Sequence, residues 1–163
     1  DEDIAADMYN AICDTLKNHG FEHYEISNWA KNGYYSRHNS RYWDLSEYLG
    51  IGSSAHSLFN GQRFEYSANI NDFISGVKPI EEEQVDGFNR ADEFIMLSLR
   101  TSRGINSFEY EQKFNKSFKP IEKALKKYIA HGLVQNKNDT WFLTETGFLV
   151  SNAILSDVLT SVE

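Results

Sequence analysis

One histidine followed by two aromatic residues is the part of the sequence best suited to chemistry. His38 and Asn39 precede Tyr42 and Trp43 within the run RHNSRYW. A neutral imidazole is a competent axial ligand for haem iron, and aromatic rings can stack on a flat macrocycle. A loop histidine beside aromatic residues is more often a hydrogen-bonded surface or core residue. The residue types therefore permit haem binding without indicating it.

The second candidate site is the run GIGSSAHS at residues 50–57. Its small residues would let backbone amides and carbonyls approach a nucleotide-like ligand. The dinucleotide-binding pattern G-x-G-x-x-G fails at its third glycine, where Ala55 stands, and no Walker lysine follows. A tight turn between a strand and a helix explains the run equally well, so both interpretations stay open.

Other chemistries find less support in the residues. His38 and His56 do not occur at zinc-ligand spacing with Glu25 or Asp44. Cys13 is the only cysteine, and its place on an apolar helix stripe favours a half-buried thiol over a nucleophile. The chain has no apolar run of about 20 residues and no signal-peptide pattern at its start. These features predict a cytoplasmic protein without a membrane span.

A lysine-rich helix in the second half suggests a different class, a nucleic-acid-binding module. Glu122 interrupts its positive face, and the helix lacks the Arg and Asn residues that usually read bases. The net charge of −8 also disfavours nonspecific binding to nucleic acid. We therefore favour a solvated face. The lysines are Lys116, Lys119, Lys123, Lys126 and Lys127.

The elements that must position these residues fall into two units of different charge. Residues 1–87 hold 6 Lys and Arg against 15 Asp and Glu, whereas residues 88–163 hold 10 against 9. In the first unit we expect a helix ended by Gly20, a strand over 21–26, an aromatic loop over 28–46 and a strand over 48–51. One helix and two strands do not close a core, so this unit resembles the last slice of a larger α/β domain.

The first unit also contains an apolar stripe and two segments that favour surface positions. A short helix is expected over 69–76, and the acidic run at 81–83 is expected to be solvated. The stripe that predicts the first helix repeats every four residues: Ile4, Met8, Ile12 and Leu16.

The second unit is mainly helical. Periodic apolar residues predict helices ending at Arg100 and Phe114 and a third over 118–129, followed by a hairpin with strands at 133–135 and 141–143. Thr144 is a plausible N-cap for a final helix through Val158. This order is typical of a winged-helix-like module, so the fold class expected for the whole chain is α+β.

These residues resemble a known family. YEISNWAKNGYYSRHNSRYW and YLGIGSSAHS closely resemble the oxygen-independent coproporphyrinogen III oxidase family of radical S-adenosylmethionine proteins, and more narrowly its haem chaperone branch. The H-N-x-x-Y-W signature of that branch is met by His38, Asn39, Tyr42 and Trp43. RADEFIMLSLRTSRGI, IEKALKKYIAHGLV and LTETGFLVSNAIL resemble the family's C-terminal domain, so the resemblance covers nearly the whole chain.

The resemblance implies the fold, the cofactors and the partners. Residues 1–87 would be the last part of a radical S-adenosylmethionine barrel, and 88–163 the C-terminal domain. The family holds a 4Fe–4S cluster on three thiolates and binds S-adenosylmethionine; its chaperone branch binds haem and passes it to client haem proteins. His38 would contact haem iron with Tyr42 and Trp43 beside it. Gly52, Ala55 and His56 would line the S-adenosylmethionine pocket.

One departure limits what this chain can do. A cluster needs three thiolates, and the sequence has a single cysteine, Cys13. We therefore expect the C-terminal portion of a longer haem chaperone-like protein, with no enzyme activity of its own. There are two alternatives. One is an oxygen-independent coproporphyrinogen III dehydrogenase, which would oxidatively decarboxylate its substrate to protoporphyrinogen IX, and the other is a non-catalytic nucleic-acid-binding module at 88–163.

Overall fold

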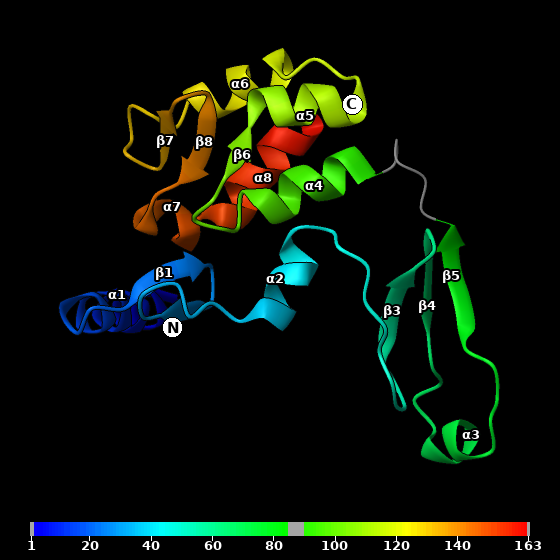
Figure 1. The fold of residues 1–163 in the computed structure, drawn as a ribbon. Helices are drawn as coiled ribbons and strands as arrows, with labels where there is room; N and C mark the ends of the chain where they lie inside the picture. Colours follow the sequence, from blue (N-terminus) through cyan, green and yellow to red (C-terminus); the bar gives the residue numbers. More distant parts are fainter. Residues whose placement is uncertain (1, 85–89, 163) are drawn as a thin grey trace.

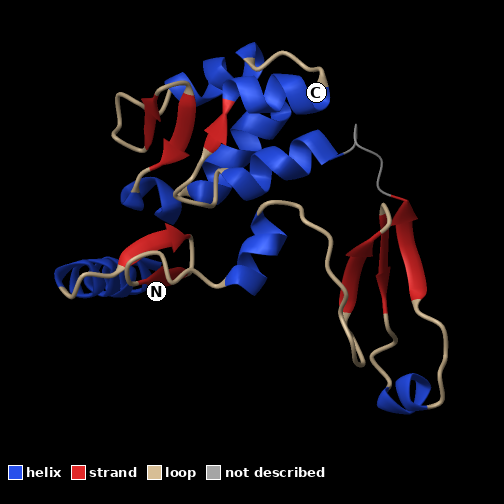
Figure 2. Ribbon diagram, in the orientation of Figure 1, coloured by secondary structure: helices blue, strands red, loops and turns tan. Residues whose placement is uncertain are grey.

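The computed structural model describes residues 2–84 and 90–162 (Figure 1). In that part of the chain, helices and short antiparallel strands form a mixed α+β structure (Figure 2). No helix of the described residues is both long and apolar enough to span a membrane. The expected boundary at residue 87 falls within 85–89, which lie outside the described residues.

The C-terminal unit has the predicted order of elements. A three-stranded antiparallel sheet in the order β6-β8-β7 lies beside five helices (Figure 1). The winged-helix-like description remains a prediction. The elements are α4 (Arg90–Ser98), β6 (Ile105–Asn106), α5 (Ser107–Phe114), α6 (Lys119–Lys126), β7 (Val134–Lys137), β8 (Thr140–Leu143), α7 (Glu145–Leu149) and α8 (Ser151–Thr160).

The predicted final helix is two helices. Thr144 is its N-cap as predicted, because its hydroxyl accepts a hydrogen bond from the Gly147 amide at 3.0 Å. At Val150 the backbone leaves helical geometry, with φ −111° and ψ 19°, so α7 ends and α8 begins. The prediction of one continuous helix was wrong at this residue.

The C-terminal unit contains the main hydrophobic core. Apolar faces of its helices meet the inner face of the sheet. From the described part of the first half, Leu45 is buried in this core, and Tyr9 and Ile26 are partly buried against it. Among the described residues, the apolar side chains with no more than 1% exposure are those of Ala91, Phe94, Ile95, Leu99, Ile105, Tyr110, Ile121, Ala124, Leu125, Val134, Ile154 and Val158.

The expected aromatic loop at 28–46 contains regular structure. After α1 (Glu2–Asn18) and β1 (Glu22–Glu25), the chain turns into β2 (Asn28–Ala30), which pairs antiparallel with β1. A two-turn helix, α2 (Arg37–Trp43), follows. Its N-cap is Ser36, whose hydroxyl accepts a hydrogen bond from the Asn39 amide at 3.3 Å.

Helix α1 confirms the predicted helix but buries a different face. Ile4, Met8 and Ile12 are 57%, 61% and 45% exposed. The inward face lies one residue further along the helix and includes Tyr9 and Cys13, which is only 5% exposed. Cys13 is therefore buried rather than half-buried, while Tyr9 on the same face of α1 meets His23 and Trp29 of the β1–β2 hairpin.

A separate three-stranded sheet follows α2 in the order β3-β4-β5 (Figure 1). Its strands are β3 (His56–Phe59), β4 (Gln62–Glu65) and β5 (Ile80–Gln84), and α3 (Ile70–Ile74) confirms the helix expected over 69–76. The expected strand over 48–51 is only a bridge between Tyr48 and Leu58. The acidic side chains at 81–83, which we expect to be solvated, are outside the part of the chain whose side chains the structure describes.

The two halves share backbone hydrogen bonds. The free edge of β1 lies beside the segment after α4, where Glu25 and Thr101 form an antiparallel bridge. The Ile26 amide donates to the Arg100 carbonyl at 2.9 Å, and the Ser102 amide donates to the Tyr24 carbonyl at 3.1 Å. The C-terminal unit therefore supports the β1–β2 hairpin, from which the chain continues into α2.

Candidate functional site

Helix α2 brings His38 and Tyr42 together. They are four residues apart, so their side chains share one face of the helix. The imidazole Nε2 lies 2.8 Å from the Tyr42 hydroxyl, and the two rings meet edge to face. The Tyr42 ring in turn meets the Tyr48 ring edge to face, with centroids 4.6 Å apart. The His38 imidazole is thus held by a tyrosine while remaining exposed to solvent.

His38 lies in an open groove between α2 and the chain leading into β3. The groove has a volume of about 490 Å³. Leu49 and Phe59 contribute apolar surface and are 55% and 40% exposed. Arg41 contributes a guanidinium that donates to the Glu47 carbonyl at 3.4 Å. An imidazole, a cation and apolar walls in one groove suit a flat apolar ligand that carries a metal ion and acidic groups.

Trp43 does not line the groove that contains His38. It lines a different hollow of about 390 Å³, together with Tyr24, Tyr35 and Arg103. The rings of Tyr24 and Tyr35 are stacked there, with centroids 4.6 Å apart. The structure therefore brings His38 and Tyr42 together, whereas Trp43 lines this hollow and another one that it shares with Tyr42.

A buried carboxylate shapes the turn that precedes α2. Glu25 is 1% exposed, and its carboxylate accepts hydrogen bonds from the Ser27 amide, at 3.0 Å, and from the Asn28 side chain. Ser27 lies in the turn between β1 and β2 and Asn28 begins β2, so the carboxylate fixes this turn. Glu25 has this structural role, and it does not lie beside His38 in the groove.

The second predicted site is the turn that leads into the start of β3 (Figure 1). Gly52 has φ +130°, and its carbonyl accepts from the Ala55 amide at 3.2 Å. His56 begins β3, and its Nε2 lies 3.3 Å from the Glu65 carboxylate. A side chain at Gly50 would overlap the His56 carbonyl, so this glycine allows a close backbone approach. A strand, rather than a helix, follows the turn, so the strand-to-helix interpretation was wrong.

The residues of this chain do not fit an iron–sulfur cluster. Cys13 is its only thiol, and burial raises the pKa of that thiol, which opposes the thiolate form that ligates iron. Within residues 2–84 and 90–162, no group of three or more His, Cys, Asp or Glu side chains could hold a metal ion.

Part of the lysine-rich helix is neutralised by acidic neighbours. Lys126 pairs with Glu122 at 2.7 Å, and Lys127 pairs with Asp157 of α8 at 2.9 Å. The Lys127 ammonium holds the pKa of the Asp157 carboxyl below its usual range. These contacts reduce the positive charge that the helix offers, and nucleic-acid binding remains an untested prediction.

Sequence reasoning missed several residues of the His38 groove. Arg41 had a usable signal, because it lies three residues after His38 and shares its side of a helix. Leu49 and Phe59 had none, since their positions depend on the pairing of Tyr48 with Leu58 across a turn.

Comparison with known proteins finds several that are similar to this chain. Residues 86–150 match the HemN C-terminal domain. The heme chaperone HemW of Lactococcus lactis is 32% identical over 162 residues, which cover 97% of this chain and 43% of the relative. The HemW of Buchnera aphidicola subsp. Schizaphis graminum is 34% identical over 145 residues, covering 86% and 39%.

A solved structure shows the same fold at lower identity. Coproporphyrinogen III oxidase (HemN) from Escherichia coli, a radical SAM enzyme, aligns with a TM-score of 0.71 at 15% identity, covering 95% of this chain and 41% of that one. The chain thus spans less than half the length of these relatives. The predicted resemblance is confirmed: the chain is similar to the heme chaperones HemW over most of its length, and residues 86–150 match the HemN C-terminal domain.

Proposed function

We propose that this chain is the haem-binding portion of a haem chaperone-like radical S-adenosylmethionine protein that delivers haem to client haem proteins. The observation that carries the proposal is the exposed His38 imidazole in a groove with a guanidinium and apolar walls. The names of the curated relatives support the same function.

In the proposed complex, His38 binds the haem iron through Nε2. When the imidazole carries its proton on Nδ1, Nε2 accepts a hydrogen bond from the Tyr42 hydroxyl, so its lone pair is available to iron once the hydroxyl moves away. Iron replaces the hydroxyl as the partner of this lone pair. The Tyr42 ring remains beside the bound haem and keeps its edge contact with Tyr48.

The other groups of the groove suit the remainder of a haem molecule. Leu49 and Phe59 offer apolar surface to the macrocycle. Arg41 offers a bidentate donor to a propionate carboxylate. Trp43 does not line this groove, and the place predicted for it beside haem remains a prediction.

The turn at 50–57 is proposed to form one wall of an S-adenosylmethionine pocket. Gly52 and Ala55 leave the backbone accessible, and His56 stands at the start of the adjoining strand. The three thiolates of a 4Fe–4S cluster would have to come from outside this chain, which has a single cysteine. No observation favours the coproporphyrinogen dehydrogenase alternative for this chain, because the likeness to HemN at 15% identity concerns the fold alone.

A ferric haem titration of the purified chain tests the proposal. We expect one haem per chain and a loss of affinity in His38→Ala of about tenfold or more, which corresponds to at least about 1.4 kcal/mol. Tyr42→Phe should bind haem at least as tightly, since it removes the hydroxyl that competes for Nε2. His131→Ala, an exposed histidine of the C-terminal unit, is the matched control. Unchanged affinity and stoichiometry in His38→Ala would contradict the assignment.

A further inference from the structure

We propose that helix α4 sets the width of the His38 groove, with Arg90 and Glu93 as positioning residues. This inference rests on the proposed haem site, because it concerns how that groove is held open. The two walls of the groove come from different segments, α2 on one side and β3 on the other. Each wall has its own polar contact with α4.

The first wall is attached through Leu45, which follows directly after α2. Its side chain is 8% exposed and lies in the core of the C-terminal unit. Its carbonyl accepts a hydrogen bond from the Arg90 guanidinium at 2.5 Å. Leu45 has φ +58°, a conformation that leucine adopts only where its surroundings impose it. The end of α2 is therefore held by contacts with the C-terminal unit.

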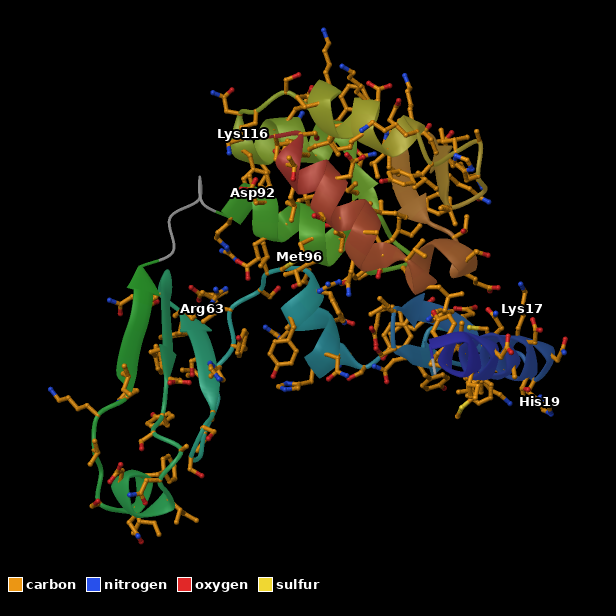
Figure 3. The ribbon with its side chains drawn as sticks, turned by 180° about the vertical axis from the view of Figure 1, so that it is seen from behind. Lys17, His19, Arg63, Asp92, Met96 and Lys116 are labelled. Carbon is orange, nitrogen blue, oxygen red and sulfur yellow. The ribbon has the colours of Figure 1, made fainter. Side chains whose placement is uncertain are left out.

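The second wall is attached through Arg63 of β4, which faces the C-terminal unit (Figure 3). Its guanidinium lies 2.6 Å from the Glu93 carboxylate, and the two side chains are only 29% and 25% exposed. Arg63 pairs with Leu58 of β3 in the sheet register, next to Phe59 of the groove wall. The ion pair therefore holds β3 through its neighbouring strand.

The two attachment points lie close together on α4. Arg90 and Glu93 are three residues apart, which places them on one face of the helix. A rigid helix that holds both walls fixes the separation of His38 from Phe59 without touching a ligand in the groove. Neither residue lines the groove itself, so both act through the segments that they hold.

A charge exchange across the ion pair tests the inference. Arg63→Glu and Glu93→Arg each place like charges together, so each should weaken haem binding by about tenfold, the equivalent of about 1.4 kcal/mol. The double variant restores an opposite-charge pair and should recover most of the affinity. Glu122→Gln on α6, which removes an exposed ion pair elsewhere, is the control and should leave haem binding unchanged.

Hydrogen exchange of the haem-free chain separates this inference from the proposed function. The single variants should increase amide exchange in β3 and β4, and Leu45→Ala should increase it in α2, while α6 and α8 stay protected. The exchange measurement does not depend on haem binding. If His38→Ala binds haem normally, only the proposed haem site is contradicted. Unchanged exchange and affinity in the single variants, or a double variant that recovers neither, would overturn the inference. If the single variants do not fold, the double variant alone tests the inference. Haem affinity and amide exchange close to those of the wild type would support it, and weaker binding with faster exchange would overturn it.

Discussion

The two halves of the molecule differ in how many of their apolar side chains they bury. Of the 23 buried apolar side chains among the described residues, 18 belong to residues 90–162. Of the 17 large apolar side chains that are exposed there, 13 belong to residues 2–84. The C-terminal unit closes its own core, whereas the first half leaves apolar surface open, including Leu49 and Phe59 beside His38. The C-terminal unit thus supports the first half, and the exposed apolar surface of the first half is where a ligand can bind.

The largest effect expected from this difference concerns matched truncations in the two halves. Leu125→Ala removes a side chain with 0% exposure from the C-terminal core and should lower the free energy of unfolding by about 2–5 kcal/mol. Met8→Ala on α1 truncates a side chain that is 61% exposed and should change it by less than about 0.5 kcal/mol. Urea unfolding measures both, and equal losses would contradict the contrast.

Alanine variants of two glycines with similar φ angles should show a smaller difference in stability. Gly104 has φ +67°, and a Cβ there would overlap the Trp141 carbonyl, whereas Gly20 has φ +76° and open space around it. Gly20→Ala should cost about 1–2 kcal/mol from the left-handed backbone alone. Gly104→Ala should cost more, because β8 must also move. Midpoints of thermal unfolding provide the measurement, and a Gly20 variant less stable than the Gly104 variant would refute it.

The contact between the two halves should weaken in mild acid. His23 stacks on Trp29 at 4.2 Å and meets Phe148 of α7 edge to face. Burial lowers the pKa of His23, although Glu25 and Glu145 oppose this effect. The unfolded chain takes up a proton near pH 6.5 while the folded chain resists it, so stability falls as pH decreases below that value.

The loss attributable to His23 should not exceed about 1.4 kcal/mol per pH unit. Unfolding free energies of the wild type and of His23→Phe, measured between pH 7.5 and 5.5, test this expectation. The variant keeps the ring packing and removes the titrating group, so its stability should depend less on pH. Parallel curves for the two proteins would show that His23 is not responsible.

The sequence predicted the fold best where local signals and tertiary packing agree. In the C-terminal unit, apolar periodicity and the Thr144 cap indicated helices and a hairpin that the structure contains. Helix α2 was missed because its Asn, Ser and aromatic residues favour loops, and only the Ser36 cap marks its start. The face that α1 buries was also missed, since Tyr9 and Cys13 turn inward only because the β1–β2 hairpin lies there.

The candidate site was predictable as far as local spacing reaches. His38 and Tyr42 could be paired from their spacing once they are placed on a helix. The position of Phe59 could not, because it follows from the bridge between Tyr48 and Leu58. Trp43 is adjacent to Tyr42 in sequence, yet it lines other hollows than the His38 groove, which spacing alone did not predict.

The most direct test of the haem site is the spectrum of the iron itself. Electron paramagnetic resonance of the ferric haem complex should show imidazole nitrogen coordination in the wild type and in the His131→Ala control. The account predicts that His38→Ala loses this signature, even at haem concentrations that saturate the variant. An imidazole signature that persists in His38→Ala would show that another residue binds the iron and would contradict the central claim.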